Sequence, residues 1–285
     1  MHVVHGPERR GLAEGLASAV GAVARGYERQ VFPDGERYVR LSEPLEGPTA
    51  LIADLRPGDL LIEALVAADA VREAGGGPVW LCAPYLAYGR QDRAFQPGEA
   101  VSSRAVLSAL GTAVDALVTV DVHAPAALKF FPATALDESA GPEIAAALSE
   151  RSVDLVLAPD EGARERASAV AELLDAPFDH LDKTRLSANE VRVASKDLDV
   201  RDRRVAIVDD IISTGGTMAT ATRHLLAAGA ARVVVAATHG LFVGDAVRRL
   251  TEAGVRDVMV TDAVPTDRSV ISCAGALARG VRRLG

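Results

Sequence analysis

Residues 205–217, with the sequence VAIVDDIISTGGT, limit the possible folds of this chain more than any other segment. Residues 205–208 are apolar without alternation, which predicts a parallel strand covered on both faces. Two acids and a small, hydroxyl- and glycine-rich turn follow, and residues 218–228 have a helical pattern. Such a unit places the turn at the carboxyl end of a strand and the amino end of a helix, where backbone N–H groups point outward without helical partners.

The chemistry of this turn indicates an anion beside a ligand that carries hydroxyl groups. Glycine lets the backbone approach a phosphate, and the side-chain hydroxyls add donors. Asp209 and Asp210 suit sugar hydroxyls or a hydrated Mg²⁺ instead. An ordinary polar turn is the alternative, but two acids on a buried strand with no nearby base are costly without a ligand. The turn residues that we expect to bind the anion are Ser213, Thr214, Gly215, Gly216 and Thr217.

No Lys follows the glycines, which excludes a Walker A nucleotide loop.

The rest of the chain alternates short β-rich runs with Ala- and Leu-rich helical patterns. This alternation predicts an α/β fold of mainly parallel sheets flanked by helices. The expected strands lie at residues 50–52, 79–82, 116–120, 155–158, 205–208, 233–238 and 258–261. The expected helices lie at residues 12–23, 59–73, 102–110, 141–148, 163–174, 217–228 and 244–252.

The length of 285 residues exceeds what one hydrophobic core usually holds, so two domains are expected. We place the boundary near residues 133–142, with one domain at 1–139 and another at 140–285. No Pro-, Ser- or Gly-rich linker separates these halves, and they could be structural duplicates. The last residues of the chain could pack back on the first domain.

Composition excludes several classes of protein. The hydrophobic fraction of 49% excludes a disordered chain, and the net charge of −8 argues against a nucleic-acid partner. Cys82 and Cys273 lie in apolar runs, where buried free thiols are expected. No apolar stretch approaches the 18 residues of a membrane span and no signal sequence opens the chain, which predicts a cytoplasmic protein without a membrane partner.

Five further polar segments have the composition of binding loops. They are residues 32–36 (FPDGE), 85–93 (YLAYGRQDR), 121–124 (DVHA), 159–163 (PDEGA) and 182–185 (DKTR). Taken alone, the first is most simply a plain β-turn. The second is equally consistent with an arginine-rich loop that grips phosphate oxygens and with a solvated surface turn. In the third, Asp and His two positions apart after a strand are expected on the same side, although a single His there is more often structural.

Together and in this order, these segments resemble the ribose-phosphate pyrophosphokinase (PRPP synthetase) family. Residues 205–217 resemble the loop of the type I phosphoribosyltransferase fold that binds phosphoribosyl diphosphate, and residues 237–240 (ATHG) and 260–265 (VTDAVP) extend the match. The resemblance covers about residues 31–265. It implies two tandem phosphoribosyltransferase-like domains. The implied reaction transfers the diphosphoryl group of Mg·ATP to the 1-hydroxyl of ribose 5-phosphate and releases AMP.

The resemblance also implies residue roles. Asp209, Asp210 and residues 213–217 would hold ribose 5-phosphate, and Lys183 and Arg185 would act in catalysis from a mobile loop. Mg²⁺ would lie near His123 and Asp160. The ring of Phe32, with its neighbouring acids, would contact adenine, typically from a neighbouring subunit, so a homodimer or larger homo-oligomer is expected. The residues implied for the ATP site are Phe32, Asp34, Glu36, Arg90, Gln91, Asp92 and His123.

The chain departs from the family pattern in places. Ser213 stands where many bacterial and eukaryotic members carry Asp, and the loop looks more like that of the archaeal-type members. Ala163 stands where a second Gly is frequent, and the chain is shorter than the usual allosteric enzymes. These differences argue against the usual regulation by phosphate and ADP and leave the size of the oligomer open. The nucleotide and metal preferences stay open as well, because contacts with the ring of Phe32 do not report the identity of the base.

Two alternatives remain at this stage. A phosphoribosyltransferase that consumes PRPP shares the 205–217 loop but leaves the segments of the first half without a purpose. A non-catalytic relative that regulates a true synthetase would be expected to lack some of the loop bases or ribose-loop acids. Here Lys183, Arg185, Asp209, Asp210 and His123 are all present.

Overall fold

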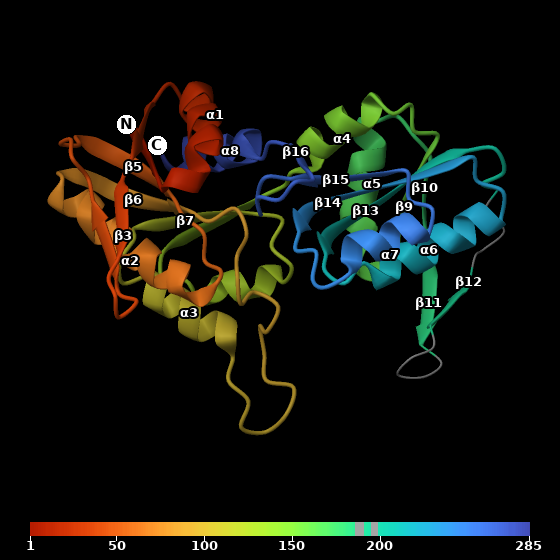
Figure 1. The fold of residues 1–285 in the computed structure, drawn as a ribbon, viewed down its shortest axis with the longest axis horizontal. Coiled ribbons are helices and arrows are strands. Elements are labelled where there is room, and N and C mark those ends of the chain that lie inside the picture. Colours follow the sequence, from red (N-terminus) through yellow and green to blue (C-terminus); the bar gives the residue numbers. More distant parts are fainter. Residues whose placement is uncertain (186–190, 195–198) are drawn as a thin grey trace. The chain divides into compact units, whose positions relative to one another are not determined.

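The computed structural model describes residues 1–185, 191–194 and 199–285 (Figure 1). The chain divides into two compact units. The first contains residues 1–139 and 272–285, and the second contains residues 140–271.

The first unit is built on a six-stranded parallel sheet in the order β2-β1-β5-β6-β7-β8. Helices α1 and α8 pack together on one face, and α2 and α3 cover the other (Figure 1). The strands are β1 His2–His5, β2 Val23–Gly26, β5 Gly47–Ile52, β6 Gly76–Cys82, β7 Ala116–Val120 and β8 Thr134–Glu138. The helices are α1 Arg10–Val20, α2 Gly58–Glu73, α3 Ser102–Leu110 and α8 Ala274–Leu284, with the short 3-10 helices η1 Pro7–Arg9 and η2 Pro125–Phe130.

Helix α8 completes the first unit from the far end of the chain. Its small and apolar residues are buried, whereas its arginines face outward. A Cβ atom on Gly280 would lie only 2.4 Å from Cγ1 of Val118, so glycine lets the helix approach strand β7 closely. Arg283 Nη1 donates to Glu138 Oε1 at 2.7 Å, which ties the end of the helix to β8.

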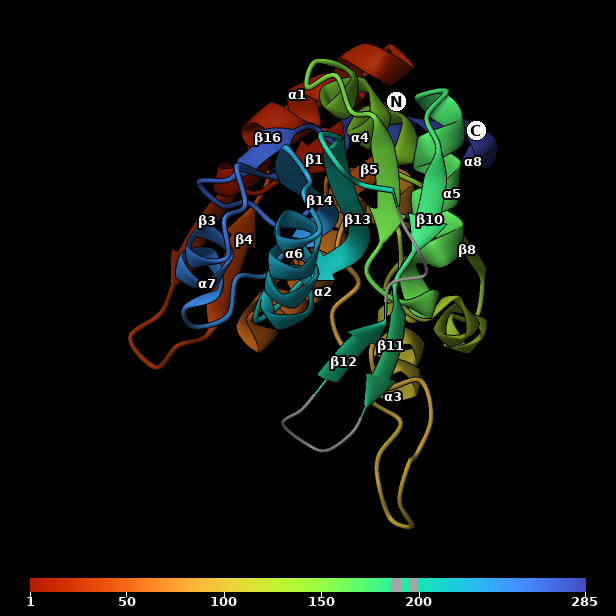
Figure 2. The ribbon, with the colours of Figure 1, turned by 90° about the vertical axis from the view of Figure 1, so that its right-hand side faces the viewer.

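The second unit has a six-stranded parallel sheet in the order β10-β9-β13-β14-β15-β16. Helices α4 and α5 lie on one side of it, and α6 and α7 lie on the other (Figure 2). The strands are β9 Leu155–Ala158, β10 Phe178–His180, β13 Arg204–Ile212, β14 Arg232–Gly240, β15 Asp257–Thr261 and β16 Ser269–Ile271. The helices are α4 Gly141–Ser149, α5 Arg164–Leu173, α6 Gly216–Ala227 and α7 Ala246–Glu252, with the 3-10 helix η3 Glu161–Ala163.

The two units repeat one topology. In each, the second strand pairs on one side of the first, and the third strand crosses to its other side. An antiparallel hairpin interrupts each unit between its second and third sheet strands. These hairpins are β3 Glu28–Val31 with β4 Arg37–Arg40 in the first unit, and β11 Asp182–Arg185 with β12 Val191–Ala194 in the second. The units are therefore structural duplicates, as the sequence allowed.

The α/β class with parallel sheets is confirmed, and each predicted strand and helix has a counterpart in the structure. The short strands β1, β2, β8, β10 and β16 were not predicted because they are short or carry polar residues, and the C-terminal helix α8 was also missed. Both cysteines are free and buried as expected, and burial raises the pKa of Cys82 to about 12. No helix in the described part of the chain is long and apolar enough to cross a membrane.

Candidate functional site

The site begins where the second sheet changes direction. From β9 the chain adds β10 on one side and then crosses to β13 on the other, so the loops after β9 and β13 leave the sheet in opposite directions. Ligands of open α/β sheets bind in the crevice formed at such a point, outside the carboxyl ends of the strands. Asp160 follows β9, and Asp209 and Asp210 lie near the end of β13.

The acid pair lies inside the strand and not after it. The expected end of the strand at Val208 is wrong, because Ile211 and Ile212 still pair with His239 and Gly240 of β14. The N–H of Asp210 donates to Oδ1 of Asp209 at 2.8 Å, and the side chain of Asp210 is buried. Two neighbouring acidic residues thus lie within a paired strand of the sheet.

This crowding changes the protonation of the pair. Burial first, and then the negative charge of Asp210, raise the pKa of Asp209 to about 8. The charge of Asp160, which follows β9, acts in the same direction and is the smallest of these effects. Without a ligand, the acid pair therefore binds a proton more readily than isolated carboxyl groups do, and a bound cation would reverse this effect.

The turn after β13 has the backbone that the glycine pattern predicts. Gly215 has a φ of +71°, and a Cβ atom there would lie 3.1 Å from the carbonyl oxygen of Ala246, so a larger residue is both strained and crowded. Helix α6 starts at Gly216, and Gly215 offers no side chain to cap it. The N–H groups of its first turn can therefore be satisfied by an anion.

Arg249 of α7 also reaches this turn, and no sequence motif pointed to it. Its Nη1 donates to the carbonyl oxygen of Thr214 at 3.0 Å. The two residues lie 35 positions apart. An arginine in an ordinary helical pattern carries no signal of such a contact, so only the fold reveals it.

At the corresponding point of the first sheet, an ion pair joins the segments that follow β1 and β5. Arg9 follows β1 and is buried, and its Nε donates to Oδ2 of Asp54, which follows β5, at 2.8 Å. A second bond from Nη2 of Arg9 to Oδ1 of Asp54 makes the pair bidentate. The first unit therefore neutralises its acid with a base, whereas Asp209 of the second unit lies beside another acid, Asp210.

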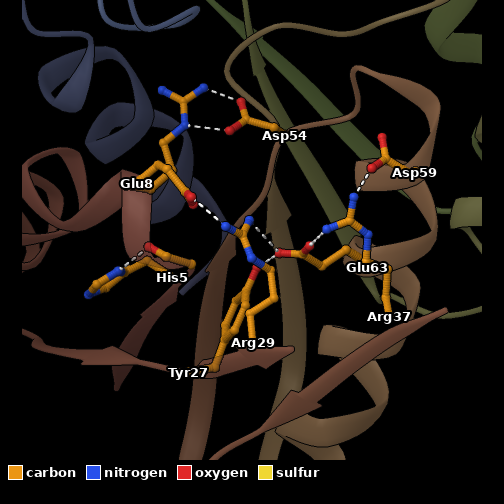
Figure 3. A network of polar contacts seen from close by, with 10 residues as sticks. His5, Glu8, Tyr27, Arg29, Arg37, Asp54, Asp59 and Glu63 are labelled. Carbon is orange, nitrogen blue, oxygen red and sulfur yellow. Dashed lines mark hydrogen bonds and ion pairs between the residues drawn. The ribbon is translucent and has the colours of Figure 1, made fainter. Parts of the chain in front are cut away.

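The hairpin β3–β4 of the first unit is anchored at its base by Glu63 of α2 (Figure 3). The buried carboxylate accepts a hydrogen bond from Tyr27 Oη at 2.8 Å and lies 3.6 Å and 3.5 Å from guanidinium nitrogens of Arg29 and Arg37. Desolvation and the charge of Glu63 raise the pKa of Tyr27, which keeps its hydroxyl protonated as a donor. Glu63 thus contacts both strands of the hairpin, while Glu8 also pairs with Arg29 and Asp59 of α2 also pairs with Arg37.

The tip of this hairpin carries the first predicted segment. Phe32 and Glu36 close the turn with a backbone bond of 2.9 Å, and Asp34 Oδ1 accepts the N–H of Glu36. The ring of Phe32 is 44% exposed and makes an edge contact with Tyr38. The predicted β-turn is present in the backbone, and the ring of Phe32 and the two acids are exposed at the tip.

The second predicted segment lies in the loop between β6 and α3. The side-chain Oε1 of Gln91 accepts a hydrogen bond from Ser102 Oγ at 2.8 Å, and its backbone carbonyl accepts one from Ser103 Oγ at 3.0 Å. These contacts fix Gln91 at the start of α3. Arg90 is exposed and Asp92 is partly buried.

His123 follows β7, the neighbour of β6 in the sheet, so both loops leave from the same edge. The expectation that Asp121 and His123 project to the same side assumed an extended chain. That assumption fails because Asp121 has a φ of +44°, and Asp121 is buried while His123 is exposed.

The predicted residues thus fall into separate groups. Asp160, Asp209, Asp210 and the turn at 213–217 gather at one edge of the second sheet, whereas Phe32, Gln91 and His123 come from three segments of the first unit. The side chains of Lys183 and Arg185 lie outside the described part of the structure. Among the described residues, no group of three or more His, Cys, Asp and Glu side chains is placed to hold a metal ion.

Comparisons with known proteins follow the same division. Residues 1–113 match the model of the N-terminal domain of ribose phosphate pyrophosphokinase, and residues 138–258 match that of the phosphoribosyl transferase domain. The ribose-phosphate pyrophosphokinase of Methanopyrus kandleri is 43% identical, with 96% of each chain covered. That of Methanosarcina acetivorans is 35% identical over the whole of both chains.

A solved structure supports the same relationship. The phosphoribosylpyrophosphate synthetase of Mycobacterium smegmatis is 29% identical and superposes with a TM-score of 0.83, covering 99% of this chain and 98% of the other. The fold, the order of the motifs and these relatives together show that this chain belongs to the ribose-phosphate pyrophosphokinase family.

Proposed function

We propose that this chain is a ribose-phosphate diphosphokinase that makes PRPP and AMP from ATP and ribose 5-phosphate. In this reaction the 1-hydroxyl oxygen of the sugar forms a bond to the β-phosphorus of ATP. The bond from that phosphorus to the oxygen bridging it to the α-phosphorus breaks, AMP leaves with this oxygen, and the hydroxyl proton is lost. The observation that carries the proposal is the acid pair of β13 followed directly by a glycine turn at the start of α6.

The second unit would bind the sugar phosphate. Asp209 and Asp210 are held side by side where they can accept hydrogen bonds from sugar hydroxyls. The turn at residues 213–217 offers backbone N–H groups and hydroxyls to the 5-phosphate. The protein thereby aims the 1-hydroxyl, which is most of what phosphoryl-transfer catalysis requires of it.

The first unit would bind ATP. Phe32 at the hairpin tip would contact adenine together with Asp34 and Glu36, while residues 90–92 and His123 would contact the remainder of the nucleotide. The exposure of Phe32 supports this role, because a ring at a hairpin tip is free to stack on a base. In this proposal the hairpin serves a neighbouring subunit, so the active form is a homodimer or larger homo-oligomer.

Mg²⁺ fits the residues present if the substrates supply most of its ligands. Mg²⁺ keeps several waters and commonly takes one or two carboxylates plus substrate phosphates, so a protein cluster of three ligands is not needed. Asp160, close enough to raise the pKa of Asp209, would hold the ion on the sugar side, and His123 would lie near it and the ATP phosphates. When bound, the ion would neutralise charge on the phosphates.

Lys183 and Arg185, by resemblance, would stabilise charge on the transferred group from the loop that contains β11. A cation at this point acts on charge that grows in the transition state, and so would affect kcat more than the KM for ribose 5-phosphate.

The test is the formation of AMP and PRPP by purified protein with Mg²⁺, ATP and ribose 5-phosphate. We expect both products in equal amounts, and their loss in the Asp209→Asn variant. Activity only with PRPP and a nucleobase would identify a phosphoribosyltransferase instead. No AMP formation together with co-purification of an active synthetase would identify a regulatory relative.

A further inference from the structure

Arg249 of α7 lies against the turn that is proposed to bind the 5-phosphate. Its Nη1 donates to the Thr214 carbonyl oxygen at 3.0 Å, and a Cβ atom on Gly216 would lie 3.7 Å from the same nitrogen. The guanidinium group therefore sits beside both the turn and the first residue of α6. The side chain is otherwise exposed, so its other donors can face solvent or a ligand.

Backbone hydrogen bonds from the segment before α7 support the same turn. Leu241 and Phe242 donate backbone bonds to the carbonyl of Ile212, and Val243 donates to that of Ser213 at 3.0 Å. Further along, Leu250 of α7 packs close to Gly215. Residues 241–249 thus donate hydrogen bonds to the carbonyl oxygens of residues 212, 213 and 214. Arg249 donates through its side chain, and the other donors are backbone N–H groups.

Charge gives the guanidinium a second purpose. Asp160, Asp209 and Asp210 gather next to the turn, and a phosphate bound there would be repelled by any of them that are ionised. A guanidinium beside the start of α6 offsets that repulsion and adds to the favourable field of the helix N-terminus.

We propose that Arg249 is a positioning residue of the phosphate turn, which fixes the Thr214 carbonyl and makes the turn selective for a phosphorylated sugar. This inference rests on the proposed binding of ribose 5-phosphate at residues 209–217. We therefore expect Arg249 to affect the affinity for the sugar phosphate and not the affinity for ATP.

The neighbouring residue Arg248 supplies a matched control. Its guanidinium bonds Asp245 at 2.7 Å and Glu252 at 2.9 Å, both on the exposed side of the same helix. Arg248→Ala removes the same charge from the same helix without touching the turn. Arg249→Lys keeps the charge but loses the fixed fork of donors.

Steady-state kinetics of Arg249→Ala, Arg249→Lys and Arg248→Ala test the inference. We expect Arg249→Ala to raise the KM for ribose 5-phosphate about tenfold or more, because a charge-assisted contact is lost. The kcat and the KM for ATP should change less than about threefold, Arg249→Lys should be intermediate, and Arg248→Ala should stay within about twofold of wild type.

Three results would overturn the inference: an unchanged KM for ribose 5-phosphate in Arg249→Ala, an equal rise in Arg248→Ala, or an equal rise in the KM for ATP. If the wild type forms no AMP at all, the proposed function fails separately. Calorimetric titration with ribose 5-phosphate alone then decides about Arg249. A tenfold weaker affinity in Arg249→Ala only would support the role, and equal affinities or no binding by wild type would reject it.

Discussion

The buried position of Asp209 lowers the stability of the ligand-free protein. Burial and the neighbouring charge of Asp210 raise its pKa from 3.8 to about 8, so the ionised form is disfavoured in the fold. In a binding site, a ligand can compensate the unfavourable charge of such a group. A buried acid with a purely structural role is instead expected to have a base beside it. Asp54 of the first unit, which is paired with Arg9, is an example of such a structural acid.

The raised pKa of Asp209 predicts a pH-dependent stability of the ligand-free protein. A folded-state pKa above the unfolded value contributes stability below pH 4 that is lost as pH rises through about 8. The Asp209→Asn variant does not titrate at this position. We expect its Tm to match that of wild type near pH 4, and to exceed it by about 3 °C or more at pH 9.

Differential scanning fluorimetry from pH 4 to pH 9, without Mg²⁺ or substrate, measures this difference. A Tm difference that is constant over the whole range would show that Asp209 does not carry the shifted pKa.

At the scale of elements, the hairpin β3–β4 is held against α2 by Glu63 and, through Arg37, by Asp59. Glu63 bonds Tyr27 and lies between Arg29 and Arg37, which belong to the two strands of the hairpin (Figure 3). The strands are short and polar, and their pairing alone would be marginally stable. The orientation of the tip therefore follows from this cluster.

We predict that Glu63→Gln loosens the hairpin and raises the KM for ATP several-fold. The amide can still accept a bond from Tyr27, but Arg29 and Arg37 each lose one of their two acidic partners and keep only Glu8 and Asp59, which costs about 1–2 kcal/mol of stability. Glu73→Gln at the exposed end of the same helix is the control and should behave as wild type. Kinetics with ATP and with ribose 5-phosphate varied separately check the prediction. Equal rises in both KM values would contradict a local role.

At the scale of the whole molecule, the first unit needs both ends of the chain. Helix α8 packs against α1 and β7, and the close approach of Gly280 to Val118 leaves no room for a methyl group. Residues 272–285 therefore belong to the core of the first unit although they follow the second in sequence.

This packing predicts that Gly280→Ala lowers the stability of the protein by about 1–3 kcal/mol, because the added carbon forces α8 away from β7. The matched control is Gly11→Ala in α1, where a Cβ atom would meet nothing within 4 Å. The control should be neutral or stabilise by up to about 1 kcal/mol, since alanine favours helix. Urea unfolding followed by circular dichroism compares the two variants. An equal effect of both would contradict the close packing of α8.

Sequence periodicity predicted the buried central strands because their apolar runs, such as residues 116–120 and 155–158, reflect a core that covers both faces of a sheet. It failed at the edges, where β2 and β10 are short and half exposed. Helix α8 was missed because its buried face is mostly alanine and glycine, and three arginines interrupt it. Its role depends on contacts with distant strands.

In the candidate site, too, local features could be predicted from the sequence, and contacts between distant residues could not. The turn at 213–217 could be predicted because glycine, hydroxyls and a helix start lie together in the chain. The contacts of Arg249, Arg9 and Glu63 join residues that are distant in sequence, so local patterns do not contain them. The extent of β13 beyond Val208 was also missed, because two acids look like the end of a strand until the pairing with β14 is seen.

The most direct test of the account is a crystal structure of the protein with ribose 5-phosphate and Mg²⁺. We expect the 5-phosphate at the turn of residues 213–217 and the sugar hydroxyls on Asp209 and Asp210. A pentose bound anywhere else, or the same two carboxylates without contact to the sugar, would contradict it.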